Sequence, residues 1–208
     1  MKNLTKSLIG VTAVVFASMA QGTVITNLED ATNGGGFFGA VTFENNGLNT
    51  VTVTANVAAP INAGLTNADI LGLWFDFNDF SSLSGPITFS STVLDFEFGE
   101  NSVGSSLGGN VNLNGSGATN WDLAVEVGEN GSDGGFIQSL SFDITIAGLD
   151  ETAFLDQRVG MRVQSIEGLQ SFNGGSSKLL DVTVPEPGSL ALLALGLVGL
   201  GVTRKMRR

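Results

Sequence analysis

The 208-residue sequence contains no cysteine, no histidine and no tyrosine. Without cysteine the chain forms no disulfide bond, and without cysteine and histidine it lacks the usual ligands of zinc. The Ser/His and Cys/His pairs that activate a nucleophile are excluded for the same reason. These absences direct attention to carboxylates, aromatic side chains and the two ends of the chain.

Positive charge is also scarce, with nine Lys and Arg residues against 20 Asp and Glu residues. Six of the nine positive residues lie near the chain ends, so residues 21–187 hold three positive and 20 negative residues, a net charge of −17. Repulsion at this charge density disfavours nucleic acid and anionic lipid. We therefore expect no nucleic-acid partner.

The first 20 residues have the pattern of a signal peptide. Lys2 and Lys6 precede an apolar run at 8–16, and small residues occupy the positions that a signal peptidase reads. The pattern predicts cleavage between Ala20 and Gln21. The alternative is an uncleaved anchor or a buried helix.

The last 25 residues combine a proline motif, an apolar segment and a basic end. The motif is Pro185, Glu186 and Pro187, and the end is the cluster Arg204, Lys205, Arg207 and Arg208. As a helix, the uncharged stretch 187–203 spans about 25 Å, just under the ~30 Å hydrocarbon core, so we predict a minimal transmembrane helix at 188–203. The basic cluster stops transfer and stays in the cytoplasm, which places the acidic middle on the far side.

This order of features resembles the bacterial PEP-CTERM sorting signal. The resemblance implies export, transient anchoring in the cytoplasmic membrane, recognition of residues 185–187 by an exosortase-type membrane peptidase, and release to the cell surface or the extracellular polysaccharide. It divides the chain into a signal peptide at 1–20, a central domain at 21–183 and a sorting tail at 184–208. The alternative is a stiff proline spacer before an ordinary tail anchor.

The central domain is predicted to be all-β. Apolar and polar residues alternate with period two in seven segments, at 50–57, 71–77, 94–98, 121–127, 140–146, 159–164 and 180–184. Because alternate residues of a strand point to opposite faces, each strand has one apolar face. Stacking two such sheets gives an antiparallel β-sandwich, jelly-roll-like, flanked by the signal peptide and the single transmembrane helix. Asn-Gly pairs mark the turns, and Asp150 is the expected N-cap of a short helix ending near Gln157.

Two groups of oxygen ligands suggest a hypothetical Ca²⁺ site. One group is Asp76, Asn78 and Asp79, after an aromatic strand, and the other includes Glu129 and Asp133 in a glycine-rich loop. Calcium takes six to eight oxygen ligands in flexible geometry. The alternative is that these are solvated turn residues, because Asp and Asn favour turns without any ion.

Trp74 and the carboxylates of 95–100 are the remaining candidates for chemistry. Trp74 lies opposite Phe75 and Phe77 in the strand pattern, so we interpret it as a hypothetical exposed platform for a sugar ring, with burial as the alternative. Asp95, Glu97 and Glu100 offer the paired carboxylates of a glycosidase, but they are more simply explained as charges that keep an edge strand wet. We expect no enzyme.

Together these features predict an exported structural or adhesive protein of the cell surface or extracellular matrix, associated with exopolysaccharide. A calcium-dependent carbohydrate-binding module is the first alternative, and a secreted hydrolase is the second. No cofactor is predicted other than calcium.

Overall fold

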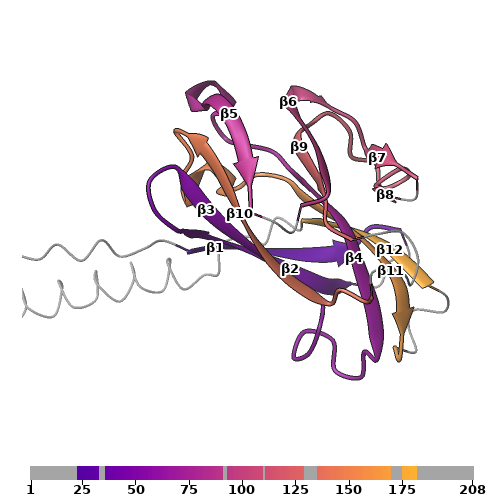
Figure 1. The fold of residues 1–208 in the computed structure, drawn as a ribbon. Coiled ribbons are helices and arrows are strands. Elements are labelled where there is room, and N and C mark those ends of the chain that lie inside the picture. The colour runs from indigo at the N-terminus through magenta and orange to yellow at the C-terminus, as the bar shows by residue number, and fades with distance from the viewer. Residues whose placement is uncertain are drawn as a thin grey trace, which may run out of the picture.

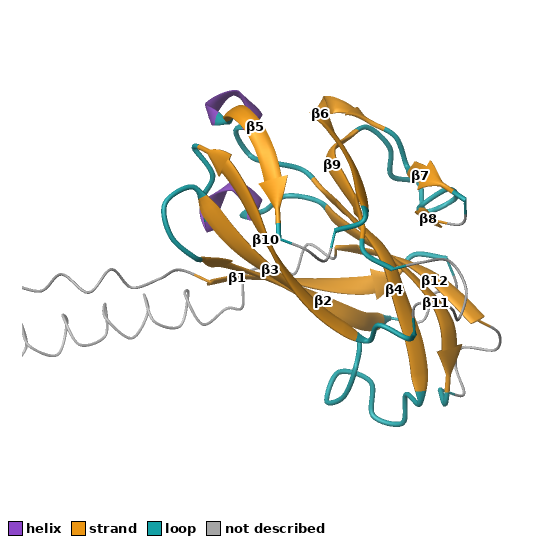
Figure 2. Ribbon diagram, viewed as in Figure 1, coloured by secondary structure: helices purple, strands orange, loops and turns teal. Residues whose placement is uncertain are grey.

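The structure is a computed structural model that describes residues 23–32, 36–90, 93–109, 111–128, 135–169 and 175–181, and strands dominate it (Figures 1 and 2). The predicted all-β class is confirmed. The signal peptide, its cleavage site at Ala20, the sorting motif at 185–187, the segment 188–203 and the basic end all lie outside the described residues. Within the described residues, no helix has the length and apolarity needed to cross a bilayer.

Ten strands of the described residues form one antiparallel sheet in the order β5-β10-β3-β2-β1-β12-β11-β4-β9-β6. Their bounds are β1 Thr23–Asp30, β2 Phe37–Asn45, β3 Thr50–Asn56, β4 Asn67–Phe75, β5 Ser84–Phe89, β6 Asp95–Val103, β9 Trp121–Glu126, β10 Ser139–Ala147, β11 Val159–Glu167 and β12 Gly175–Asp181. The sheet curls, so that its two edge strands, β5 and β6, stand near one another at the top of Figure 1.

The main core fills the inside of this curl. It gathers alternate residues of nearly every strand, including Phe43, Val53, Phe75 and Ile144, none of which is exposed to solvent. The two separate sheets of the predicted sandwich are therefore replaced by one sheet that folds over itself. Period-two alternation specifies only that apolar faces meet, and a curled sheet satisfies it as well as two stacked sheets do.

A second, smaller core lies on the outer face of β4 and β9. The two-stranded sheet of β7 (Ser106–Gly108) and β8 (Val111–Asn112) covers it. Gly160 permits the close approach, because a Cβ at that position would lie 2.4 Å from Leu113 Cδ1 and 3.3 Å from the Trp121 ring. Both sides of β4 are thus buried.

The alternation predicts Leu71, Trp121 and Leu180 on the apolar core face of their strands, and the structure places all three on the opposite face. A register shift between Ile70 and Gly72 turns Leu71 outward into the second core, as a β-bulge does. Trp121 also joins the second core, where β9 begins, instead of sharing a face with Leu123. In β12, Leu179 enters the main core whereas Leu180 packs on the second.

The turns and the short helix between strands are predicted more accurately than the faces to which the strand side chains point. Gly47 and Gly115 adopt φ angles of 119° and 87°, as expected for Asn-Gly turns. The short helix is a 3₁₀ turn, η2 (Glu151–Phe154), and Asp150 caps it by accepting a hydrogen bond from the Thr152 amide. A second 3₁₀ turn, η1 (Phe80–Ser82), precedes β5.

Candidate functional site

The carboxylate of Asp76 is held by Arg158 at the end of β4. Arg158 Nε donates to Asp76 Oδ2 at 2.5 Å, and its terminal nitrogens donate to the carbonyl oxygens of Thr119 and Asn120. The guanidinium also lies 4.7 Å from the centroid of the Trp121 ring. Burial raises the pKa of Asp76, and Arg158 acts against that rise. The arrangement ties together the chain before β9, the end of β4 and the start of β11.

The three residues proposed as calcium ligands in this region each have a protein partner of their own. Asp76 pairs with Arg158, Asn78 donates to the Thr152 carbonyl, and Asp79 accepts from the Ser81 hydroxyl. Glu129 and Asp133 lie outside the described residues. Among the residues that are described, no group of three or more acidic side chains is placed to hold a metal ion.

Trp74 is fully buried, so the predicted exposed platform is wrong. Its ring packs in the second core with Leu71 and Val111, and its Nε1 donates to the Gly104 carbonyl at 3.1 Å. The prediction that Trp74 and Phe75 point to opposite faces of the strand is correct. The sequence gives no sign that β7 and β8 fold back over the face of Trp74, because they are too short to show periodicity.

Asp95, Glu97 and Glu100 are all exposed on β6, one of the two edge strands. Asp95 Oδ1 accepts a hydrogen bond of 2.8 Å from the Phe96 amide. A glycosidase needs one carboxyl whose pKa is raised by burial across a cleft, and these positions do not provide that burial.

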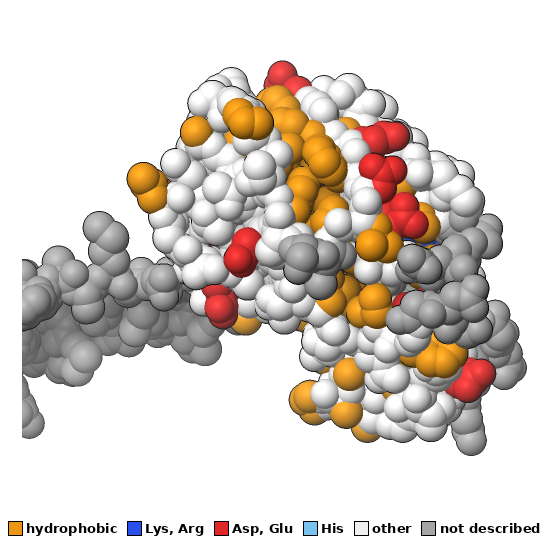
Figure 3. Space-filling view, in the orientation of Figure 1, with side chains coloured by type: hydrophobic (Ala, Val, Ile, Leu, Met, Phe, Trp, Pro, Cys, Tyr) orange, Lys and Arg blue, Asp and Glu red, His pale blue; other side chains and the backbone are white. Residues whose placement is uncertain are grey.

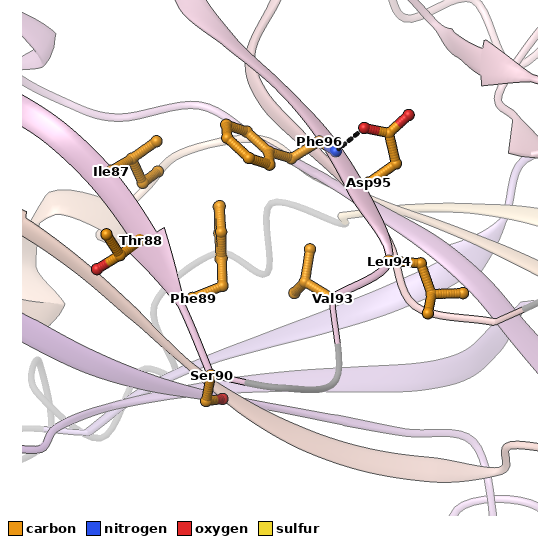
Figure 4. Close-up of a pocket in the computed structure, with 8 residues that line it drawn as sticks. All are labelled: Ile87, Thr88, Phe89, Ser90, Val93, Leu94, Asp95 and Phe96. Atoms are coloured by element: carbon orange, nitrogen blue, oxygen red, sulfur yellow. Dashed lines mark hydrogen bonds between the residues drawn. The ribbon is translucent and has the colours of Figure 1, made fainter.

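The edge strands β5 and β6 do not pair with each other, and a groove of about 410 Å³ lies between them. Ile87 and Phe89 contribute from β5, Phe96 contributes from β6, and Val93 contributes from the connection between the strands. The rings of Phe89 and Phe96 point toward one another, 4.9 Å apart between centroids, whereas Leu94 points away (Figure 4). Figure 3 shows a hydrophobic stripe running down this face, with acidic side chains beside it.

Sequence reasoning missed this groove. The strand β5 carries Gly85 and Pro86, which are read as turn residues, so Phe89 has no predicted strand to lie on. One sequence feature could have pointed to the groove. The three carboxylates within 95–100 imply an exposed strand, and charged side chains are typical of strands at the edge of a sheet.

A family model described as the PEP-CTERM protein-sorting motif matches residues 183–208. No curated protein and no solved structure matches the chain. The motif implies exosortase-dependent export to the cell surface or the extracellular space, and an exosortase as the processing partner.

Proposed function

We propose that this PEP-CTERM sorting-signal protein is a structural or adhesive protein of the cell surface or extracellular matrix, and that its β-domain associates with extracellular polysaccharide. The observation that carries the proposal is the match to the sorting motif at residues 183–208, since that motif determines where the domain works. We further propose that the domain acts by binding and not by catalysis.

The proposed route has three steps. The signal peptide is removed between Ala20 and Gln21, the segment 188–203 holds the protein briefly in the cytoplasmic membrane, and exosortase acts at residues 185–187. The net charge of −17 on residues 21–187 keeps the released domain soluble.

Replacing Pro185, Glu186 and Pro187 by alanine in the producing cells tests the sorting step. We expect the variant to accumulate in the membrane fraction at a higher mass, whereas the unchanged chain reaches the surface or the medium. Glu44→Ala is the matched control, because Glu44 is an exposed carboxylate far from the tail in sequence. Normal processing of the triple variant would contradict the proposed recognition.

Co-sedimentation with the polysaccharide secreted by the same cells tests the binding step. The protein is recovered as the cells process it and is mixed with the polysaccharide in calcium, and separately in chelator. We expect sedimentation in both conditions. Sedimentation that is lost in chelator would support the calcium-dependent carbohydrate module instead, and no sedimentation in either condition would contradict the association.

A further inference from the structure

The groove between β5 and β6 is a seam at which the curled sheet stops short of closing into a barrel. Phe80 and Phe98 stack across the inner part of the seam with centroids 5.0 Å apart, and Phe77 packs on both rings. Closer to solvent the contact between Phe89 and Phe96 is only partly covered, and Phe96 remains 42% exposed. The seam therefore presents aromatic surface that the protein itself does not bury.

The backbone at this seam is poorly suited to accept another strand. On β5, Pro86 has no amide hydrogen, and Gly85 adopts a φ of 83°, outside the extended region. On β6, the amide of Phe96 already donates to the Asp95 side chain. Charged side chains on an edge strand also discourage strand addition. Recognition here thus falls to side chains, which makes an extended peptide a poor occupant.

The charge of the seam restricts its partner further. Asp95 and Glu97 flank Phe96 in β6, so their carboxylates lie on the other face of the strand, along the rim of the groove, and Glu100 continues the negative charge along β6. In the described ranges, the positive residues are Arg158, Arg162 and Lys178, which precede or lie on β11 and β12 and donate to protein acceptors. A second copy of the chain would bring like charges together, and an acidic polysaccharide would be repelled.

From this combination we propose that the seam binds a polysaccharide that carries free amino groups. Sugar rings pack on Phe89 and Phe96, and ammonium groups that extend past the free edge of β6 pair with Asp95 and Glu97 at the rim. This inference rests on the proposed association with polysaccharide and names the charge class of the polymer and the site. A neutral sugar would contact the rings but would gain no electrostatic attraction from the carboxylates.

The test uses glucosamine oligosaccharides, the fully N-acetylated oligosaccharides of equal length, and an acidic polyuronate, each titrated into the protein as the cells process it. We expect binding of the glucosamine oligomer, about tenfold weaker binding after N-acetylation, because each exposed ion pair is worth only a few-fold in affinity, and no binding of the polyuronate. Added salt should weaken binding of the glucosamine oligomer more than binding of the N-acetylated oligomer, because salt screens the ion pairs.

Variants locate the site. Phe96→Ala and the Asp95→Asn, Glu97→Gln double variant should each lose about fivefold or more in affinity. Leu48→Ala and Glu44→Gln are the matched controls, since Leu48 is 89% exposed between β2 and β3 and Glu44 is an exposed carboxylate of β2. A cooperative thermal transition with a midpoint well above the assay temperature excludes misfolding as the cause of any loss.

The inference is overturned if acetylated and amino oligomers bind equally, if the polyuronate binds as well, or if the seam variants bind like the controls. Sedimentation of the cells' own polysaccharide by the same seam variants would then preserve the proposed function and refute only the seam. Failure of the unchanged protein to sediment with that polysaccharide would refute the proposed function separately. Strand-like capture of a peptide at the seam would also overturn the inference.

Discussion

The strands β4 and β6 pair with opposite sides of β9, yet they are used in opposite ways. Eight of the nine residues of β4 are buried, whereas six of the nine residues of β6 are exposed. Each strand contains two aromatic side chains, Trp74 and Phe75 in β4 and Phe96 and Phe98 in β6, so the difference does not come from aromatic content alone. It comes from what covers each strand.

On β4, one face looks into the main core and the other is covered by β7 and β8. On β6, the carboxylates Asp95 and Glu97 alternate with Phe96 and Phe98, and no further strand of the described residues pairs beyond it. The strand β9 thus pairs with β4, which is buried in the two cores, and with β6, which is largely exposed at the surface. This contrast leads to four predictions, which follow from the largest effect to the smallest.

Truncating one aromatic residue should destabilise the protein much more on β4 than on β6. Trp74→Ala removes a fully buried ring and should lower the free energy of unfolding by about 3–5 kcal/mol. Phe96→Ala removes a ring that is 42% exposed and should cost about 1 kcal/mol or less. Urea unfolding of both variants measures the difference. Equal losses would mean that β6 is as much a core strand as β4.

Removing the cation at the end of β4 should cost about 2 kcal/mol in the free energy of unfolding. Arg158→Met leaves the mostly buried carboxylate of Asp76 without its cationic partner. The loss of unfolding free energy stays below that for a fully buried ion pair, because the Arg158 side chain is 42% exposed. Lys178→Met is the control that removes one positive charge from β12. The loss should shrink when Asp76→Leu is added, and additive losses in this double-mutant cycle would show that the pair is not coupled.

Adding one methyl group beneath the second core should cost about 1–2 kcal/mol. In Gly160→Ala the new Cβ meets Leu113 Cδ1 at 2.4 Å and the Trp121 ring at 3.3 Å, so side chains of the second core must shift. Gly104→Ala is the matched control, because its Cβ would meet nothing closer than 3.8 Å. Chemical denaturation measures both variants. A neutral Gly160→Ala would indicate that β7 and β8 pack loosely on β4 and β9.

Mild acidification should raise stability slightly. Burial raises the pKa of Asp69, Asp76 and Asp181 above the ordinary value of 3.8. At pH values between 3.8 and the raised pKa values, the folded state therefore binds more protons than the unfolded state. The free energy of unfolding then increases as pH falls from neutrality through the folded pKa values, and these groups contribute no further gain below 3.8.

Thermal melts between neutral pH and pH 4 in high salt measure this effect, because salt screens the repulsion among surface carboxylates far more than it affects buried ones. The melting midpoint of Asp69→Asn should depend less on pH. That variant keeps an oxygen for the Ile137 amide, which donates to Asp69 Oδ1 in the folded chain. A midpoint that falls steadily on acidification would contradict the expected sign.

The sequence predicts the parts of the fold that depend on local alternation. The strands β3, β10 and β11 follow their period-two patterns, and Asp150 caps its short helix as expected. The face of Leu71 could not be predicted, because a register shift between β4 and β11 turns that side chain, and such a shift depends on the partner strand. The face of Trp121 could not be predicted either, because Trp121 is the first residue of β9 and packs in the second core beneath β7 and β8.

The candidate sites depended even more on long-range structure. Trp74 is covered by a short hairpin more than 30 residues later in the chain, and Arg158 reaches Asp76 across 82 positions. No local pattern encodes such contacts. The carboxylates at 95–100, in contrast, indicated an edge strand from their exposure alone, and β6 is that edge. The sorting motif was predictable because it is a linear order of residues that does not depend on the fold of the domain.

The most direct test of the account is a hydrogen-exchange footprint of the protein, as the cells process it, with and without the polysaccharide of those cells. The account predicts added protection in peptides covering β5 and β6 and unchanged exchange in β4, which is already buried on both faces. Unchanged exchange across β5 and β6 while the polysaccharide is bound would contradict it.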